Sequence, residues 1–303
     1  MNPTRATAVS AKMLNRPWSR KSLFFVLIVV LLVFNFCTLV LAYPETFRLD
    51  GGGRLAKDFS AYYIGAWRLL HNPSKVYTRG LVNDGEYQVY PQSQAYKYLP
   101  SFLMLLSPFL SLSYHDALVA FDAFQFALLP LMAFLLYRLL SKKSLAVTLL
   151  VAVIVFTPFP LPHWGPIATY YWQWAEGQAK VFETFLFLLS FYLGTRGKPI
   201  LSGVAFGFAA FDPRFALLSL PLFLLYNGSN LRVAAGTGVG VLLLSNFWLF
   251  LPATGAGFIN MIFTDGANTT LYAYAYIPLF TIVSLIAVNG REIAEAFSHY
   301  ITT

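Results

Sequence analysis

Apolar runs close to the thickness of a lipid bilayer recur along this chain, and they constrain its fold more than any other feature. The first extends from Leu23 to Ala42 without a charged side chain. A helix needs about 20 predominantly apolar residues to cross the hydrocarbon core. Only 11% of all residues are charged, whereas a typical soluble domain has about 25%. Because backbone polar groups must be satisfied internally in lipid, the sequence predicts an all-α, polytopic integral membrane protein.

Positive charge predicts how these runs are oriented. Basic residues stand before the first run and in the short connections between later ones: Arg5, Lys12, Arg16, Arg20, Lys21, Arg138, Lys142, Lys143, Arg196, Lys198, Arg232 and Arg291. Such connections favour the cytoplasmic side of a membrane. Residues 1–22 are therefore expected in the cytoplasm, and residues 43–98 are expected to form a large loop on the outer face. The first run is longer than the apolar core of a signal peptide, so it is interpreted as an uncleaved anchor in the cell membrane.

The chain is expected to fold as one membrane domain, residues 1–303, with about eight transmembrane helices. The expected crossings are Leu23–Ala42, Asp116–Leu140, Leu145–Phe159, Lys180–Gly194, two short helices within Ile200–Tyr226, Leu231–Leu251 and Leu271–Asn289. The Ile200–Tyr226 run is divided because Asp212-Pro213-Arg214 stands at its centre, and charges are tolerated in a membrane only beside a cavity or a partner. Tyr98–Leu112 is apolar but short, which indicates a re-entrant or interfacial segment.

Composition and motifs also exclude several functions. The net charge is +8, but no dense basic patch with base-stacking aromatic residues lies outside the apolar runs, so no nucleic-acid partner is expected. The single cysteine, Cys37, excludes an intrachain disulfide. Neither zinc-ligand spacing, a phosphate-binding loop nor a serine-triad motif is present. A DxD motif is also absent, so neither a metal nor a cofactor is expected.

Asp58 follows three glycines and begins an aromatic, amphipathic segment of the outer loop. The apolar positions that follow it have the 3–4 residue spacing of one helical face: Phe59, Tyr62, Tyr63, Ala66, Trp67 and Leu70. This pattern predicts a helix that lies in the membrane interface. Asp58 itself has two interpretations. It is either the N-cap of that helix, accepting backbone N–H groups, or a catalytic base at the membrane surface.

Other polar residues on the expected outer face also have alternatives. Arg214 suits a phosphate, because its planar fork matches phosphate oxygens, but an ion pair with Asp212 or snorkelling to the interface also explains it. His163 is either a structural histidine or an acid–base or phosphate contact. Glu176 precedes a helix, where the helix dipole favours a carboxylate. Glu183 lies inside that helix, so it requires a partner or a cavity.

Several segments then resemble a known family when taken in order. They read DFSAYY, WRLL, YKYLPSFLMLLSPF, EGQAKVFETFLFLL and GVAFGFAAFDPRFALLSLPLFLL. Over residues 20–270 this order resembles the family 87 glycosyltransferases. These are integral-membrane enzymes of the GT-C superfamily, and they include mannosyltransferases that depend on a polyprenyl-phosphate-mannose donor.

The resemblance implies an inverting transfer of a hexose, such as mannose, from a polyprenyl-phosphate sugar donor. The acceptor would be a lipid or glycan on the outer face, and membrane lipids would surround the site. Asp58 matches the position of the catalytic base in the first outer loop, and Arg214 matches a basic residue suited to the donor phosphate. Lys57 and His163 are expected to assist Arg214 at the phosphate. The residues expected to bind the rest of the substrates are Tyr62, Tyr63, Tyr98, Glu176 and Gln178.

This sequence also departs from the family pattern. Lys180 stands where a small or amide residue is common, and Asp212 adds a charge beside the basic position. Family members usually continue for several more spans after the position of Asn289, so the C-terminal part is expected to be shorter than usual. A partner subunit is then one source of the missing acceptor half. The alternative function is a non-catalytic, lipid-binding GT-C-like subunit, a membrane scaffold or a carrier, although the inverted repeats typical of carriers are absent.

Overall fold

The computed structural model describes residues 19–46, 56–78, 96–140, 143, 145–156, 173–262 and 277–302. All regular elements in these ranges are helical, as predicted. The α-helices are α2 (Arg20–Thr46), α3 (Lys57–His71), α4 (Pro100–Leu106), α5 (Tyr114–Leu139), α6 (Leu145–Phe156), α8 (Lys180–Thr195), α9 (Pro199–Ala209), α10 (Pro213–Asn227), α11 (Leu231–Ser245), α12 (Pro252–Met261), α13 (Ile277–Val288) and α14 (Gly290–Thr302). Short 3₁₀ helices are η1 (Pro73–Lys75), η2 (Ser107–Ser111), η3 (Gly228–Asn230) and η4 (Phe247–Phe250).

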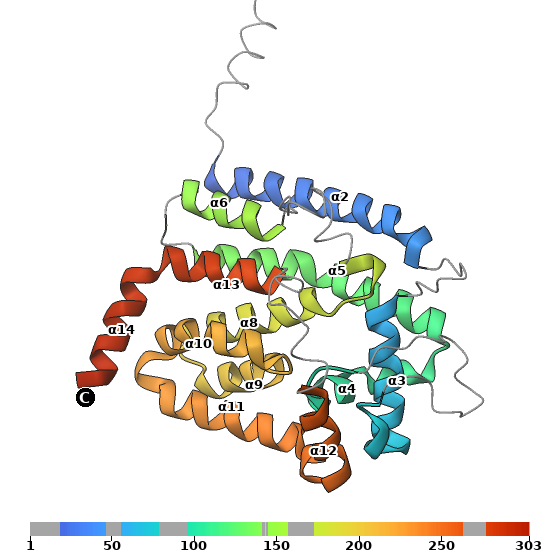
Figure 1. Cartoon of the computed structure of the whole chain (residues 1–303). Helices are drawn as coiled ribbons and strands as arrows, with labels where there is room; N and C mark the ends of the chain where they lie inside the picture. The colour runs from blue at the N-terminus through green and yellow to red at the C-terminus, as the bar shows by residue number, and fades with distance from the viewer. Residues whose placement is uncertain are drawn as a thin grey trace, which may run out of the picture.

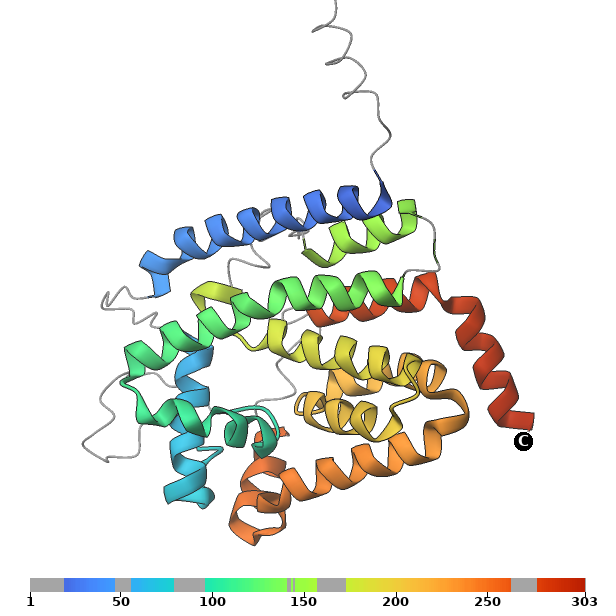
Figure 2. The same ribbon diagram turned by 180° about the vertical axis from the view of Figure 1, so that it is seen from behind.

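The helices are arranged in layers, with two specialised ends (Figure 1). Helices α2 and α6 lie side by side on one surface, and α5 and α13 form the next layer. Helix α8 packs beneath α5 and against α9, which in turn packs on α11. Helices α3, α4 and α12 gather at one end of this stack, whereas α14 projects from the other, and the view from behind shows the same arrangement (Figure 2).

Helix length differs from the expectation of about eight full crossings. Among the described residues, two helices are long and apolar enough to cross a membrane by length and composition, Phe24–Pro44 within α2 and Tyr114–Leu139. The other described helices have at most 16 residues, which corresponds to about 24 Å against a hydrocarbon core of about 30 Å. Helices end inside the apolar runs, as α11 does at Ser245 within Leu231–Leu251, so the length of an apolar run overestimates the length of its helix.

The division of the Ile200–Tyr226 run into two helices is confirmed. Helix α9 ends at Ala209, and α10 begins at Pro213 after a turn that contains Asp212. Asp212 is the N-cap of α10, because its side chain accepts the backbone N–H of Arg214. Proline fits the first helical position, since its missing N–H has no intrahelical partner there. The charged triplet therefore lies in a turn, as its composition predicted.

Short helices pack closely where glycines remove side-chain bulk. A Cβ atom on Gly203 of α9 would lie 2.3 Å from the carbonyl oxygen of Ala234 in α11. A Cβ atom on Gly207 would lie 2.7 Å from the carbonyl oxygen of Gly238. Small residues allow helix backbones to approach in this way, which is a common packing device in membrane proteins. The α9–α11 contact thereby fixes the position of the turn that carries Asp212.

Candidate active site

The beginning of α3 is held by the backbone of a distant segment. The N–H groups of Asp58 and Phe59 donate to the carbonyl oxygen of Glu176 over 3.0 and 3.1 Å. Ala56 occupies the N-cap position, and no side chain caps the helix there. The interpretation of Asp58 as the N-cap is therefore wrong: Asp58 lies in the first turn, and the Glu176 carbonyl performs the capping. The carboxylate of Asp58 is partly buried, and its Oδ2 atom is shielded from solvent.

Two buried side-chain amides, those of Gln125 and Gln173, order the turn that contains Glu176. Gln125 Nε2 donates to the carbonyl oxygen of Gln178 over 2.7 Å, and Gln173 Nε2 donates to that oxygen as well. Gln173 Nε2 also donates to Gln125 Oε1 over 3.1 Å, and Gln173 Oε1 accepts the backbone N–H of Lys180 over 3.2 Å. Buried polar groups of this kind rigidify a segment when they are satisfied. The amides thus connect α5, the turn and the start of α8.

Gly177 is required at the contact between this turn and α3. Its φ angle is +62°, and a Cβ atom would lie 2.6 Å from the Cβ of Phe59. Glycine adopts positive φ without a steric penalty. Both the backbone conformation and the close approach therefore explain why position 177, just before Gln178, is a glycine.

A buried aromatic wall lies beside Asp58. The ring of Tyr62 contacts those of Tyr98 and Phe102, with centroids 5.9 and 5.0 Å apart. Tyr62 is 2% exposed, and burial raises its pKa well above the ordinary value, with the nearby Tyr98 and the negative charge of Asp58 adding to the effect. The hydroxyl of Tyr63 donates to the carbonyl oxygen of Leu112 over 2.9 Å, so it anchors α3 to the end of η2. The two neighbouring tyrosines thus have different environments.

Four charged side chains form a buried cluster next to this wall. Lys180 Nζ lies 3.1 Å from Glu183 Oε2 and 3.1 Å from Asp212 Oδ2. Arg214 donates two hydrogen bonds to the same Asp212 carboxylate, from Nε over 2.9 Å and from Nη2 over 2.7 Å. The side chains of Lys180, Glu183 and Asp212 are at most 1% exposed, whereas that of Arg214 is 32% exposed. The cluster therefore reaches solvent through the arginine.

Tyr98 connects the charged cluster with the aromatic wall. Lys180 Nζ lies 5.1 Å from the centre of the Tyr98 ring, a cation–π distance. Burial raises the pKa of Tyr98; Lys180 opposes this shift most strongly, Asp212 and Asp58 reinforce it, and Arg214 also opposes it. The charges of Asp58 and Arg214 therefore both act on one hydroxyl. Segments that are distant in the sequence meet at this point.

The backbone fixes the same meeting point. The N–H of Leu99, directly after Tyr98, donates to the carbonyl oxygen of Phe211 over 3.0 Å. The rings of Phe102 and Phe211 stack with centroids 4.5 Å apart. These contacts hold the start of α4 against the turn between α9 and α10. Tyr98 and Asp212 thus keep a defined relation to each other.

The remaining predicted site residues have different positions. Gln178 is 1% exposed, and its Nε2 donates to Glu176 Oε2 over 3.2 Å, so the two side chains pair within the turn. Lys57 begins α3, but its side chain lies outside the described part of the structure, as does His163 entirely. Arg214 is paired with Asp212, which is one of the alternatives that the sequence left open. Glu183 has the partner that its place inside a helix required.

The sequence did not indicate Lys180, Gln125 and Gln173 as site residues. Lys180 was noted as a departure from the family pattern, and its partner Asp212, the N-cap of α10, lies 32 positions later. The two glutamines have no charge. Gln125 stands inside the apolar run Asp116–Leu140, which was the available signal, whereas Gln173 lies outside the apolar runs and gave none. Within the described ranges, no group of three or more His, Cys, Asp or Glu side chains is arranged to hold a metal ion.

The fold and the site define a class: in the described ranges, a helical protein with two helices apolar enough to cross a membrane and with charged residues buried where short helices and turns meet at one end. Residues 96–291 match the model of Glycosyltransferase family 87, which is more than half of the chain. The chain therefore belongs to this family of GT-C membrane enzymes, which transfer a sugar from a donor to an acceptor. No curated protein and no solved structure matches the chain. The matched region includes Tyr98, Gln178, Lys180, Asp212 and Arg214 and begins after Asp58.

Proposed function

We propose that this glycosyltransferase moves a hexose, such as mannose, from a polyprenyl-phosphate sugar to a lipid or glycan acceptor on the outer face of the membrane. The N-terminus lies in the cytoplasm in this proposal, and the end of the bundle with α3 and α4 faces outward. A lipid-linked donor suits an outward-facing site, because nucleotide sugars remain in the cytoplasm. The observation that carries the proposal is the chain of contacts between the two sides of the site. Tyr62, one helical turn after Asp58, contacts Tyr98 with ring centroids 5.9 Å apart. Lys180 lies 5.1 Å from the Tyr98 ring and shares Asp212 with Arg214.

Asp58 is the proposed general base. Its carboxylate takes the proton from an acceptor hydroxyl while the hydroxyl oxygen attacks the anomeric carbon of the donor sugar. The bond between that carbon and the phosphate oxygen breaks, and the polyprenyl phosphate leaves with the bonding electrons. A single displacement of this kind inverts the anomeric configuration. The Glu176 carbonyl supports this role, because it caps α3 in place of the Asp58 side chain.

Arg214 is the proposed contact for the departing phosphate. Positive charge near the leaving oxygen stabilises the charge that develops in the transition state. The guanidinium is partly exposed and is oriented by the two bonds to Asp212, which Lys180 holds from the other side. In this proposal Lys180 and Asp212 position the arginine, and they do not contact the donor. Lys57 and His163 remain proposed assistants at the phosphate.

The aromatic wall and the turn before α8 are proposed to orient the sugar. Tyr62 and Tyr98 border the charged cluster, and their hydroxyls suit hydrogen bonds to sugar oxygens. Glu176, which is partly exposed, is the proposed polar contact from the turn. Gln178 supports it from within the buried network, and Tyr63 supports α3 through its bond to Leu112.

The experiment is transfer from a radiolabelled polyprenyl-phosphate mannose by the purified full chain in lipid nanodiscs. Asp58→Asn should lower the transfer rate about 100-fold or more, because a general base contributes about 10²–10⁴-fold. Asp116→Asn is the matched control. Asp116 lies on the same expected face, but it is exposed and pairs with Ser113 at the start of α5.

Two outcomes would contradict the proposal. Unchanged transfer in a folded Asp58→Asn variant would remove Asp58 from the catalytic role. A wild-type chain without transfer from any polyprenyl-phosphate hexose would favour the alternative of a lipid-binding subunit, scaffold or carrier.

A further inference from the structure

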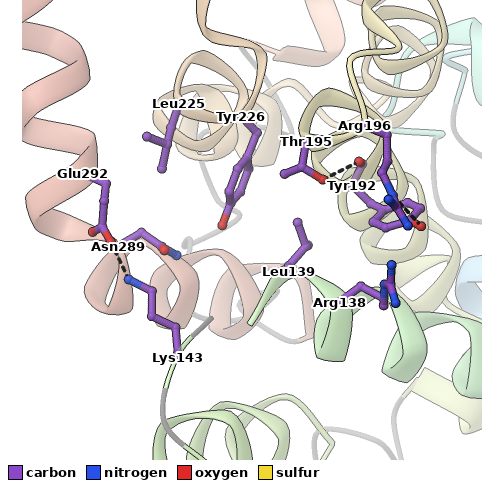
Figure 3. Close-up of a pocket in the computed structure, with 10 residues that line it drawn as sticks. All are labelled: Arg138, Leu139, Lys143, Tyr192, Thr195, Arg196, Leu225, Tyr226, Asn289 and Glu292. Atoms are coloured by element: carbon purple, nitrogen blue, oxygen red, sulfur yellow. Dashed lines mark hydrogen bonds and ion pairs between the residues drawn. The ribbon is translucent and has the colours of Figure 1, made fainter. Parts of the chain in front are cut away.

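A pocket of about 550 Å³ lies at the opposite end of α8 from the candidate active site (Figure 3). It is formed where α5, α8 and α10 end and where α13 meets α14. Lys180 is the first residue of α8, whereas Tyr192, Thr195 and Arg196 line this pocket at its last turn and just beyond. Twelve helical residues correspond to about 18 Å. The pocket is therefore separate from the charged cluster around Asp212.

The charge of the pocket is predominantly positive. Arg138, Lys143 and Arg196 line it together with one carboxylate, that of Glu292. Glu292 is engaged by Lys143, with Nζ and Oε1 2.6 Å apart. Within the described residues no carboxylate forms an ion pair with Arg196. The pocket lining thus carries three basic side chains and one carboxylate.

The two arginines converge on one phenol group. Arg196 Nε donates to the hydroxyl oxygen of Tyr192 over 3.0 Å, and the charge of Arg138 acts on the same hydroxyl. Figure 3 shows Arg138 extending from α5 toward the Tyr192–Arg196 pair. Two guanidinium groups that line one pocket repel each other, and an anion between them would relieve this repulsion. Their planar forks match the oxygens of a phosphate.

The helix ends at the pocket offer a competing explanation for these cations. The last carbonyl groups of a helix carry a partial negative charge of about half a unit, which favours basic residues nearby. That effect is confined to the last turn and explains one basic residue for each helix end. It does not explain why Arg138 and Arg196, on two different elements, turn toward the same tyrosine. Convergence on one point is the feature of a binding site.

We propose that this pocket binds the phosphate group of an anionic ligand at the cytoplasmic surface of the membrane. The basic connections of the chain predict that this end faces the cytoplasm, where basic pockets between membrane helices bind anionic lipid headgroups. Leu139 and Leu225 add apolar lining beside the arginines, which suits the glycerol part of a lipid. The volume is within the range of small-ligand sites, about 300–1,000 Å³. A diester phosphate of a lipid headgroup and a free phosphate share the required chemistry.

The test is calorimetric titration of the full chain in a neutral detergent with three probes: dioctanoyl phosphatidylglycerol, dioctanoyl phosphatidylcholine and inorganic phosphate. We expect saturable binding of a phosphate-bearing anion and none of the zwitterionic lipid. Binding of the glycerol lipid without inorganic phosphate identifies a headgroup site, whereas equal response to inorganic phosphate identifies the free ion as sufficient. Either result supports the phosphate site.

Variants make this test specific. Arg196→Gln should weaken binding about tenfold or more, because it removes a charge-assisted, bidentate contact. Arg196→Lys keeps the charge but removes the fork, so an intermediate loss is expected. Arg232→Gln is the matched control, since Arg232 is exposed on α11, outside the pocket. Arg196 is also exposed, so its variants should unfold at the wild-type temperature.

The proposal is overturned by either of two results. One is the absence of saturable binding for both anionic probes to the folded wild-type chain. The other is an equal loss of binding in Arg196→Gln and Arg232→Gln, which would show a general effect of positive charge. Neither result bears on sugar transfer, so the proposed catalytic function stands or falls separately.

Discussion

The charged side chains at the two ends of α8 differ in how far they are buried. At its beginning, Lys180, Glu183 and Asp212 are almost completely removed from solvent and satisfy one another, with Arg214 at the edge. Near its end, Arg138 and Arg196 surround an open pocket, and Lys143 pairs with a partly exposed carboxylate. A buried charge is destabilising when any of its partners is removed, whereas water weakens the attraction within an exposed pair. The first end is thus suited to a fixed geometry, and the second is where we propose an exchangeable ligand.

The largest effect on stability is expected from Asp212→Asn. This change leaves Lys180 and Arg214 beside a neutral amide and removes the anion that both contact. Breaking a buried ion pair by removal of one partner costs about 3–5 kcal/mol. The free energy of unfolding, measured by urea titration in detergent micelles, should fall by about this amount. A loss below about 1 kcal/mol, similar to that in Asp116→Asn, would contradict the difference between the two ends.

The stability of the wild type at acidic pH should also depend on the Asp212 carboxylate. Asp212 lies in the turn between α9 and α10; burial raises its pKa, but Lys180 and Arg214 outweigh burial and hold the pKa below the ordinary value of 3.8. A depressed pKa in the folded state stabilises the fold fully above the unfolded-state pKa, and this contribution is lost as the pH falls through the folded-state pKa. Wild-type stability should therefore decline below about pH 4 more steeply than that of Asp212→Asn. If the stabilities of the wild type and of Asp212→Asn fell in parallel with pH, protonation of Asp212 would not be the cause of the decline.

A smaller effect is expected from Gly177→Ala, which tests the joint between α3 and the turn before α8. The new Cβ atom would lie 2.6 Å from the Cβ of Phe59. The alanine would also have to adopt a φ of +62°. Backbone strain of this kind costs about 1–3 kcal/mol. Gly197→Ala is the matched control, because its φ is +63° with open space around the added atom. Thermal unfolding should shift further for Gly177→Ala, and equal shifts would mean that the contact with Phe59 is unimportant.

The smallest effect is expected from Glu292→Gln at the pocket end. Its ion pair with Lys143 is short, but the two side chains are 23% and 47% exposed. Water screens such pairs, so the free energy of unfolding should change by less than about 0.5 kcal/mol. Binding of phosphatidylglycerol should be retained or strengthened, because the variant removes the negative charge from the pocket. A loss of stability close to that of Asp212→Asn would remove the contrast between the ends.

Much of the helical architecture could be predicted from the sequence, because apolar runs and basic connections are local signals. The α9–α10 division followed from the charges of Asp212 and Arg214 inside an apolar run. Helix length was not predictable in the same way, since the apolar run Leu231–Leu251 continues past Ser245, where α11 ends. The mutual pairing of Lys180 and Asp212 also lay beyond the sequence, because it depends on how α8 and α10 pack.

Asp58 shows a second limit of sequence patterns. An aspartate at the start of an amphipathic helix favours the N-cap interpretation, and no local pattern indicates that a carbonyl 118 positions later fills that role. That Asp58 lies in the first outer loop, by contrast, rests on the order of segments alone and stays a prediction. Hydrogen-bond partners that are distant in the sequence thus lie beyond what a local pattern can predict.

The joint between α3 and the turn at Glu176 has a consequence for how this region tolerates change. The two bonds from Asp58 and Phe59 end on a main-chain oxygen, so they survive any exchange of the side chain at position 176. That position is therefore open to variation in size, charge and hydrogen-bonding pattern without loss of the attachment. The neighbouring glycine is not. A lineage or a designer can thus alter the side chain presented beside Asp58 while the helix beneath it stays in place.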